Sequence, residues 1–228
     1  MNDVVRVLST LAVKGAVLDL VEPYRLATGC GIDADFAPTL ALLDRLRGGE
    51  PADLVILTRE GLHELADEGK VLASSCVDLA RSYVGVAVKA GAPHPDIADE
   101  AALRAALLAA RAVAYSRIGA SGILFAALIK QMGIAAEVDG RAIILPSGLT
   151  AERLVSGEAE LAVQQISELK QVDGIEVVGP IPPALQTPAV FSAGLMAASE
   201  HCEQAEHLLR HLASRGFADV LRAAGLEP

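Results

Sequence analysis

The chain has 228 residues, a formal net charge of −10 and 52% hydrophobic residues. Its length allows two lobes of about 100 residues each, and its hydrophobic content indicates a folded protein, not a disordered one. The negative charge argues against nucleic acid and against an anionic membrane surface as partners. It leaves a small anionic ligand open, because backbone dipoles act locally. No apolar stretch is long enough to predict membrane insertion.

The cysteines and the N-terminus bear on cofactors and location. Cys30, Cys76 and Cys202 are far apart and form no CxxC motif, so we expect free thiols, no metal and no cofactor. The opening residues MNDVVRVLST contain neither the basic nor the apolar segment of a signal peptide. The chain as written is therefore expected to be cytoplasmic. It would be periplasmic if a signal peptide had been removed, and only an exported form would have an ABC permease as partner.

Strand and helix patterns alternate along the chain. Strands are expected at Val4–Leu8, Ile32–Phe36, Ala52–Leu57, Tyr83–Lys89, Ala112–Ser116, Ala142–Leu145, Leu161–Gln165, Ile175–Val178 and Val190–Ala197. Helices are expected at Leu11–Tyr24, from Pro38 to Gly48, and at Glu60–Gly69, Glu100–Ala110, Thr150–Ser156, Cys202–Ala213 and Phe217–Ala223, with one more that ends at Gly133. This alternation predicts an α/β protein with parallel sheets covered on both faces.

The turn Ser116–Gly122 is the most informative stretch. It joins a short strand to a strongly apolar helix and contains small residues, including Gly119, Ser121 and Gly122. Such a turn directs backbone N–H groups and the positive end of a helix dipole into one concavity, which favours an anion. The glycines would permit positive φ angles and close approach of a ligand. The alternative is an ordinary strand-to-helix turn, because short glycine motifs are weak signals.

An internal similarity favours two lobes. The passage LRGGEPADLVIL, which begins at Leu46, is similar to LVSGEAELAVQQ, which begins at Leu154, about 108 residues later. Each contains a helix end, a Gly-Glu pair and an apolar strand. Two α/β lobes that face each other would share a cleft at the carboxyl ends of their strands, where ligands bind in such folds.

Several passages, in this order, resemble the type II periplasmic solute-binding proteins, in particular the molybdate-binding branch. They are VRVLSTLAVKGA, GGEPADLVI, GASGILFAALIKQMGI, GEAELAVQQISEL, GIEVVGPIPPALQ and the closing AEHLLRHLAS and ADVLRAAGLEP. The resemblance implies a two-lobed fold in which each lobe is a mainly parallel sheet flanked by helices, with the ligand between the lobes. It places lobe one at residues 1–82 plus 187–228 and lobe two at 83–186. The hinge would lie near 82–86 and 183–188.

The family holds a tetrahedral oxyanion without a metal, through hydroxyl and backbone N–H groups of both lobes. Carried over by position, the resemblance implies ligand-binding roles for Ser9, Thr10, Thr39, Ser121, Gly122, Thr150 and Gln165. Two positions depart from the pattern: Ala12 replaces a usual serine, and the Gln164-Gln165 pair stands where a tyrosine is common. The passages LSTLAVKG and VQQISE instead resemble a subgroup that includes aconitate isomerase.

Several polar residues have two interpretations each. Lys14 is either a cation for a polycarboxylate, which could serve as a base, or a solvated helix lysine. Ser9 and Thr10 are ligand hydroxyls or helix caps. Arg117 is a bidentate carboxylate clamp or an exposed side chain. Gln164 and Gln165 end an apolar strand, which favours a place at the edge of a cleft over the core. The spacing of His207 and His211 would suit a metal, but no third ligand accompanies them, so we expect surface histidines.

Two functions therefore stand side by side. The first is a solute-binding protein that holds a small anion, an oxyanion or a polycarboxylate, in an interlobe cleft. The alternative is a cytoplasmic isomerase that catalyses a 1,3-proton shift on a tricarboxylate such as aconitate, with Lys14 as the base. A third interpretation, the effector domain of a transcription regulator, ranks last because no DNA-binding segment is visible in the sequence.

Overall fold

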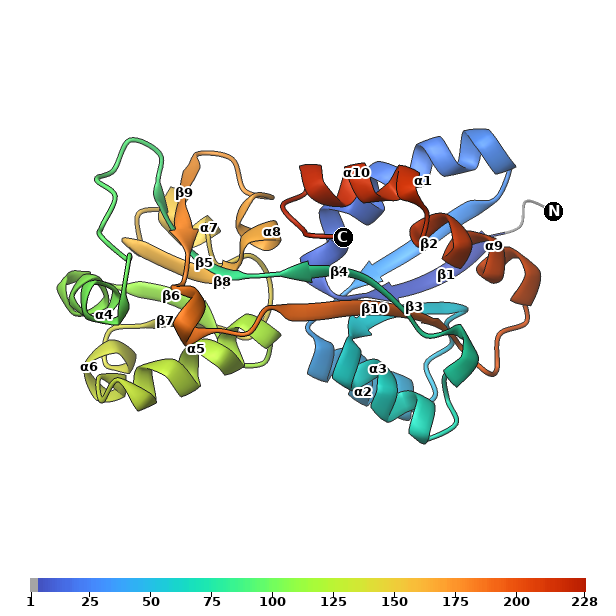
Figure 1. The fold of residues 1–228 in the computed structure, drawn as a ribbon, viewed down its shortest axis with the longest axis horizontal. Coiled ribbons are helices and arrows are strands. Elements are labelled where there is room, and N and C mark those ends of the chain that lie inside the picture. Colours follow the sequence, from blue (N-terminus) through green and yellow to red (C-terminus); the bar gives the residue numbers. More distant parts are fainter. Residues whose placement is uncertain (1–3) are drawn as a thin grey trace. The chain divides into compact units, whose positions relative to one another are not determined.

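The chain folds into two compact units, each with a five-stranded sheet. A computed structural model describes residues 4–228, so residues 1–3 of the predicted first lobe lie outside the described residues. Unit 1 contains the chain up to Ser82 together with Ala189–Pro228, and unit 2 contains Tyr83–Pro188. Helices cover both faces of each sheet (Figure 1). The predicted two-lobed α/β fold is confirmed.

Unit 1 is built from two stretches of the chain. Its elements are β1 (Val4–Ser9), the 3-10 turn η1 (Leu11–Val13), α1 (Lys14–Thr28), β2 (Gly31–Phe36), α2 (Thr39–Arg47), β3 (Leu54–Thr58), α3 (Arg59–Asp67), η2 (Ala73–Ser75), β4 (Val77–Ser82), β10 (Ala189–Leu195), α9 (Cys202–Leu212) and α10 (Arg215–Ala223). The strand order is β2-β1-β3-β10-β4. β1 runs parallel to β2 and β3, whereas β10 runs antiparallel to β3 and β4.

Unit 2 is one continuous stretch. Its elements are β5 (Val84–Lys89), α4 (Glu100–Ala109), β6 (Val113–Ser116), α5 (Ala120–Gln131), α6 (Ala135–Asp139), β7 (Ile143–Leu145), α7 (Glu152–Val155), β8 (Leu161–Gln165), α8 (Ile166–Leu169), β9 (Ile175–Pro180) and η3 (Pro183–Leu185). The strand order is β7-β6-β8-β5-β9. β6 runs parallel to β7 and β8, and β5 runs antiparallel to β8 and β9.

The two sheets share one plan. The repeated passage forms α2–β3–α3 in unit 1 and α7–β8–α8 in unit 2, and β3 and β8 are both the middle strands of their sheets. β10 and β5 are the antiparallel neighbours of these strands, so both sheets are mixed and not purely parallel as the alternation predicted. The alternation of strands and helices is interrupted directly before β5 and directly before β10. Only Tyr83 separates β4 from β5, and only η3 lies between β9 and β10, so neither has a preceding crossover helix.

The sequence patterns missed β4 and α6, and they ended α1 too early. β4 has only two apolar side chains among its last five residues, and the five-residue α6 is too short to show a helical period. α1 follows the turn η1 and continues through Pro23 to Thr28, four residues beyond its predicted end. It stops at Gly29, whose φ of 75° is the left-handed conformation that often ends helices.

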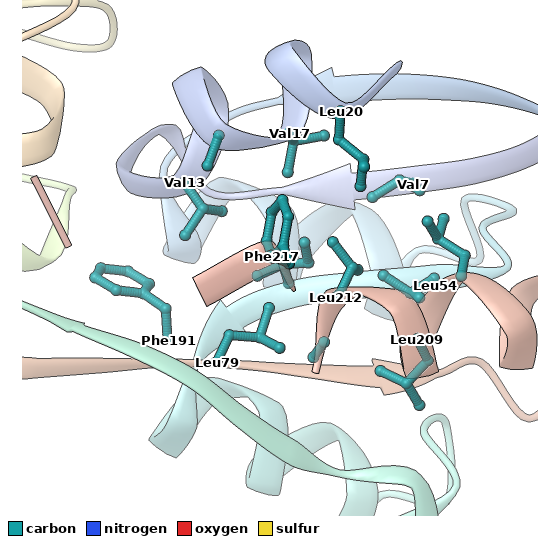
Figure 2. Packing of buried hydrophobic residues seen from close by; sticks show 14 of the residues in the cluster. Val7, Val13, Val17, Leu20, Leu54, Leu79, Phe191, Leu209, Leu212 and Phe217 are labelled. Atoms are coloured by element: carbon teal, nitrogen blue, oxygen red, sulfur yellow. The ribbon is translucent and has the colours of Figure 1, made fainter. Parts of the chain in front are cut away.

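Apolar side chains fill the space on both faces of the unit 1 sheet. α1, α9 and α10 pack on one face, and α2 and α3 pack on the other (Figure 1). Phe217 of α10 is fully buried beside Val17 of α1 and Leu212 of α9 (Figure 2). Ser214 caps α10 by accepting a hydrogen bond from the Phe217 N–H, so the cap also fixes the position of the aromatic ring.

Unit 2 has the same two-faced arrangement. α4, α5 and α6 contribute to the cluster on one face, and α7 and α8 contribute to the cluster on the other. Tyr115 and Phe125 join β6 to α5 through an edge-on ring contact, with ring centroids 4.9 Å apart. Because both rings are fully buried, this contact fixes the angle at which α5 leaves the sheet.

The paired histidines hold α9 against α1. Among the two, His207 is exposed and His211 is half-buried. Tyr24 of α1 lies against both rings, and its hydroxyl is 2.8 Å from Nδ1 of His207. His211 also contacts the ring of Phe217. Their spacing therefore places both rings in the packing between α9 and α1.

The burial of His211 should make the stability of the protein depend on pH. Burial, followed by repulsion from His207, lowers the pKa of His211 below its usual 6.5. The unfolded chain then binds this proton more readily than the folded chain, so the stabilisation is complete above about pH 6.5 and is lost as the pH falls below it. The contribution of His211 to the unfolding free energy should therefore decrease between about pH 6.5 and pH 5, separately from other groups that titrate there. His211→Gln should reduce this decrease, whereas His201→Gln, at an exposed histidine, should not. Identical urea titration curves for the three proteins at each pH would contradict this assignment.

Candidate functional site

The carboxyl ends of the parallel strands in unit 1 lie at one edge of its sheet. β1 ends at Ser9, β2 at Phe36 and β3 at Thr58, and the three strands run in the same direction. The Ala37 N–H donates to the Ser9 carbonyl, and the Thr10 N–H donates to the Ile56 carbonyl. These backbone bonds fix the segments that follow the strands, so this edge is the natural place for a ligand.

Thr10 carries the most unusual group at this edge. The residue is 3% exposed, and its Oγ1 has no hydrogen-bond partner in the part of the chain that the structure describes. Although Thr10 occupies the N-cap position of η1, its side chain makes no capping bond. Its neighbour Ser9 is fully buried and donates from Oγ to the Thr10 carbonyl at 3.2 Å. A buried hydroxyl without a partner is costly, so the group is expected to have a role outside packing.

Unit 2 has the corresponding edge. β6, β7 and β8 are parallel and end at Ser116, Leu145 and Gln165. The predicted anion turn leads from Ser116 into α5, with Ser121 buried in its first turn. A Cβ on Gly122 would lie 1.4 Å from the Ser116 carbonyl oxygen, so no other residue fits there. The expected positive φ angles are absent at Gly119 and Gly122, and what requires Gly122 is this close approach of the backbone.

Three helix starts at these edges lack the side chains that usually stabilise a helix N-terminus. α1 with its preceding turn η1, α2 and α5 begin without a capping side chain and without an acidic residue in the first turn. The other described α-helices, including α3 and α4, have a side-chain cap, a first-turn acidic residue or both. The starts without caps follow β1, β2 and β6, where the helix dipole favours an anion.

Lys14 lies at the same edge of unit 1. It is the first residue of α1, and its Nζ lies 5.8 Å from the ring centroid of Phe36, the last residue of β2. The side chain is half-buried and pairs with no carboxylate of the described residues. Its charge is therefore available to a ligand. Among residues 4–228, no group of three or more His, Cys, Asp or Glu side chains could hold a metal ion. No helix of that part of the chain is long and apolar enough to cross a membrane.

Comparison with known proteins identifies the family. The family described as bacterial extracellular solute-binding protein matches residues 5–227. The chain belongs to this family. An aconitate isomerase of a Pseudomonas species is 35% identical, and the match covers 97% of this chain and 87% of that protein.

Solved structures share the fold of this solute-binding family member. The periplasmic molybdate-binding protein of Azotobacter vinelandii matches with a TM-score of 0.82 and 18% identity over 98% of this chain and 99% of that one. The sulfate-binding protein SubI of Mycobacterium tuberculosis matches with a TM-score of 0.76 and 17% identity over 99% and 87% of the two chains. The predicted resemblance to the molybdate-binding branch, with its aconitate isomerase subgroup, is confirmed.

In this family member, Arg117 clamps a carboxylate of its own chain. Its Nη2 donates to Asp139 at 2.6 Å, and its Nε donates to the Tyr115 hydroxyl at 3.2 Å. The Tyr115 hydroxyl donates in turn to Asp139 at 2.5 Å. About half of the Arg117 side chain is exposed. The two predicted interpretations are thus combined: Arg117 is both exposed and paired, and a ligand carboxylate would have to compete with Asp139.

At the end of β8, hydrogen bonds join Thr150 to Gln164, the neighbour of Gln165. Gln164 Oε1 accepts from the Thr150 N–H at 2.7 Å and from its hydroxyl at 3.0 Å, while Gln164 Nε2 donates to the Gly148 carbonyl. Gln165 is the N-cap of α8. All three residues are buried, so they hold the strand end in a defined shape. Their roles as ligand groups stay predictions.

Glu168 was missed by the sequence patterns. It lies in the first turn of α8, forms a capping box with Gln165 and is 7% exposed. Burial raises its pKa to about 8, against the opposing effects of the Gln165 N–H and the Gln164 side chain. The spacing of Gln165 and Glu168 is that of a capping box, which was the available signal in the sequence. The burial of a carboxyl group could not be seen there.

Proposed function

We propose that this chain binds a small anion, an oxyanion or a polycarboxylate, through hydroxyl and N–H groups at the carboxyl edges of its parallel strands. The observation that carries the proposal is the Thr10 hydroxyl, which is buried and without a partner at such an edge. A ligand oxygen would satisfy it. Hydrogen bonds to a charged acceptor are roughly twice as strong as neutral ones. Such a bond would offset the cost of burying the hydroxyl away from water.

The electrostatics of the helix starts support an anion over a cation. η1, α2 and α5 begin at strand ends without acidic residues in their first turns, and Lys14 adds a positive charge beside Phe36. Each helix N-terminus is equivalent to about half a positive charge. The net charge of −10 acts over longer distances, where salt screens it, and does not prevent such local binding. Membership of a solute-binding family agrees with this function.

Calorimetric titration tests the proposal. Molybdate, tungstate, sulfate, citrate and trans-aconitate each offer oxygens to such a site but differ in shape and charge. We expect saturable binding of at least one of them, with competition between those that bind. Phosphate-free buffer and an uncharged diol of similar size serve as controls. Absence of binding for the whole panel would overturn the proposal.

A second candidate function is the isomerisation of aconitate. The 35% identical aconitate isomerase, matched over 97% of this chain, favours it. The reaction removes a proton from the methylene carbon beside a carboxylate and returns a proton to the former vinylic carbon, which moves the double bond. Lys14 would be the base and the strand-end donors would hold the developing negative charge. Structural neighbours with 17% and 18% identity share the fold and do not decide between the functions.

Incubation with trans-aconitate separates the two functions. Formation of the cis isomer by the wild-type protein would establish the isomerase, and its loss in Lys14→Met at saturating substrate would assign the base. A wild-type protein that binds trans-aconitate or molybdate but forms no cis isomer would exclude it. In that case the binding function alone stands.

A further inference from the structure

Glu168 is a buried carboxyl group at the edge where the proposed function places anion-binding groups. It follows β8 directly, in the short helix α8 that packs against β8, β5 and β9. α5, with the anion turn before it, follows β6, and β6 is the parallel neighbour of β8. Neighbouring strands run about 5 Å apart. The starts of α5 and α8 therefore lie at the same edge of the unit 2 sheet, although the two helices cover opposite faces.

Within residues 4–228, no cation forms an ion pair with Glu168. Its Oε2 accepts from the Gln165 N–H at 3.2 Å, and the Gln164 side chain is the other group that favours its ionised form. The charged residues on the described strands packed against α8 are Lys89 of β5 and Glu176 of β9, and Lys170 follows α8. Lys89 donates to the Val155 carbonyl, and Glu176 pairs with His94. None of the three interacts with the Glu168 carboxyl group.

Two exposed acidic residues of unit 2 have lowered pKa values, in contrast to Glu168. Glu158 and Glu160 are exposed and pair with Arg153 and Arg111, which lowers the pKa of both carboxyl groups. Glu168 has the opposite environment, since burial raises its pKa to about 8. At neutral pH Glu168 therefore retains its proton, and the strand end carries no negative charge there.

We propose that Glu168 couples a proton to anion binding at this edge, because its neutral carboxyl group admits an anion and its carboxylate repels one. The inference rests on the proposed function and adds a regulated property to it. Glu168 acts as a positioning residue through its neighbours. Gln164 lies beside Glu168 and accepts hydrogen bonds from both the N–H and the hydroxyl group of Thr150. A negative charge on Glu168 would therefore polarise this buried hydrogen-bond network and act on the donors at the strand end.

Coupling of this kind is reciprocal. An anion bound near Glu168 raises the affinity of the carboxylate for a proton by the same factor by which protonation raises the affinity for the anion. At an effective dielectric constant of about 20, one added negative charge about 10 Å away weakens binding by about tenfold for each charge on the anion. Binding at about pH 8 should therefore be accompanied by proton uptake.

The experiment measures anion affinity by calorimetry at about pH 6.5 and about pH 9.5. Molybdate and trans-aconitate are the probes, because both keep their charge over this range. We expect the wild-type protein to bind these multiply charged probes at least about tenfold more weakly at the higher pH. Glu168→Gln should show the same affinity at both values. Glu160→Gln, a matched control at the opposite end of β8, should keep the wild-type dependence.

If Glu168→Gln folds poorly, proton uptake by the wild-type protein on anion binding provides a second test. Wild-type titrations at about pH 8, in buffers of different ionisation enthalpy, should show uptake of a fraction of a proton per anion bound. A purely structural role for Glu168 would change stability without producing this uptake. Equal wild-type affinities at both pH values, or a pH dependence retained in Glu168→Gln, would overturn the inference and leave the proposed function intact. Absence of anion binding at either pH would overturn both.

Discussion

Thr10→Val should lower anion affinity by about 10- to 100-fold and, at the same time, raise the stability of the anion-free protein. Valine has nearly the shape of threonine, so packing is preserved. The substitution removes a buried hydroxyl that has no partner in the described residues, which should increase the unfolding free energy by about 1 kcal/mol. The affinity falls because a ligand oxygen loses a charge-assisted hydrogen bond. Calorimetric titration and urea unfolding measure the two effects.

Thr58→Val is the matched control. Thr58 ends β3 at the same edge, but its Oγ1 accepts from the Gly61 N–H and caps α3. Loss of this cap should lower stability by about 1 kcal/mol and leave anion affinity unchanged. The two variants should therefore change stability in opposite directions, and only one should change binding. If Thr10→Val were as destabilising as Thr58→Val and bound anions normally, Thr10 would have a structural role.

Gly122→Ala should be the most destabilising single-methyl change in unit 2. The added Cβ would lie 1.4 Å from the Ser116 carbonyl oxygen and 2.3 Å from its carbon. Both are backbone atoms, so no change of side-chain rotamer relieves the clash, and the start of α5 must move away from β6. We expect a loss of about 3 kcal/mol or more in unfolding free energy, together with loss of anion binding. Urea unfolding of purified protein measures the first effect.

Gly119→Ala, three residues earlier in the same turn, is the control. Its Cβ would meet only the Ser116 Oγ, at 3.9 Å, and Gly119 has a φ of −89°, which alanine adopts freely. We expect stability within about 1 kcal/mol of wild type. Comparable losses in both variants would show that the turn needs glycine for flexibility. A large loss at Gly122 alone would show that it needs close backbone contact.

The sequence predicted those parts of the site that depend on local pattern. The turn Ser116–Gly122, the apolar helix after it and the repeated helix–strand passage are all encoded over short distances, and the structure has them. By resemblance, Ser9 and Thr10 were expected at the end of the first strand and Thr39 at the start of the second helix, and the structure has them in these places. The element bounds differ mostly by one or two residues, as expected when helix ends are set by individual caps.

Properties that arise from distant contacts could not be predicted. The pairing of Arg117 with Asp139 joins residues 22 positions apart, and the lack of a partner for Thr10 is a property of its whole surroundings. The burial of Glu168 depends on three strands packed against a helix of four residues. Likewise, the antiparallel strands β5 and β10 follow from where the chain passes between units, and periodicity carries no information about that.

The position of β10 has a consequence for the order of folding. β10 lies between β3 and β4, although the 106-residue stretch of unit 2 separates it from β4 in the chain. During synthesis, Tyr83–Pro188 can complete its own sheet while β3 and β4 still lack the strand that joins them. The apolar edge of β3 then stays unpaired until Ala189–Leu195 emerges, and unpaired edges of this kind favour aggregation. Cells making this protein should therefore depend on chaperones mainly for the first unit, which begins first and closes last.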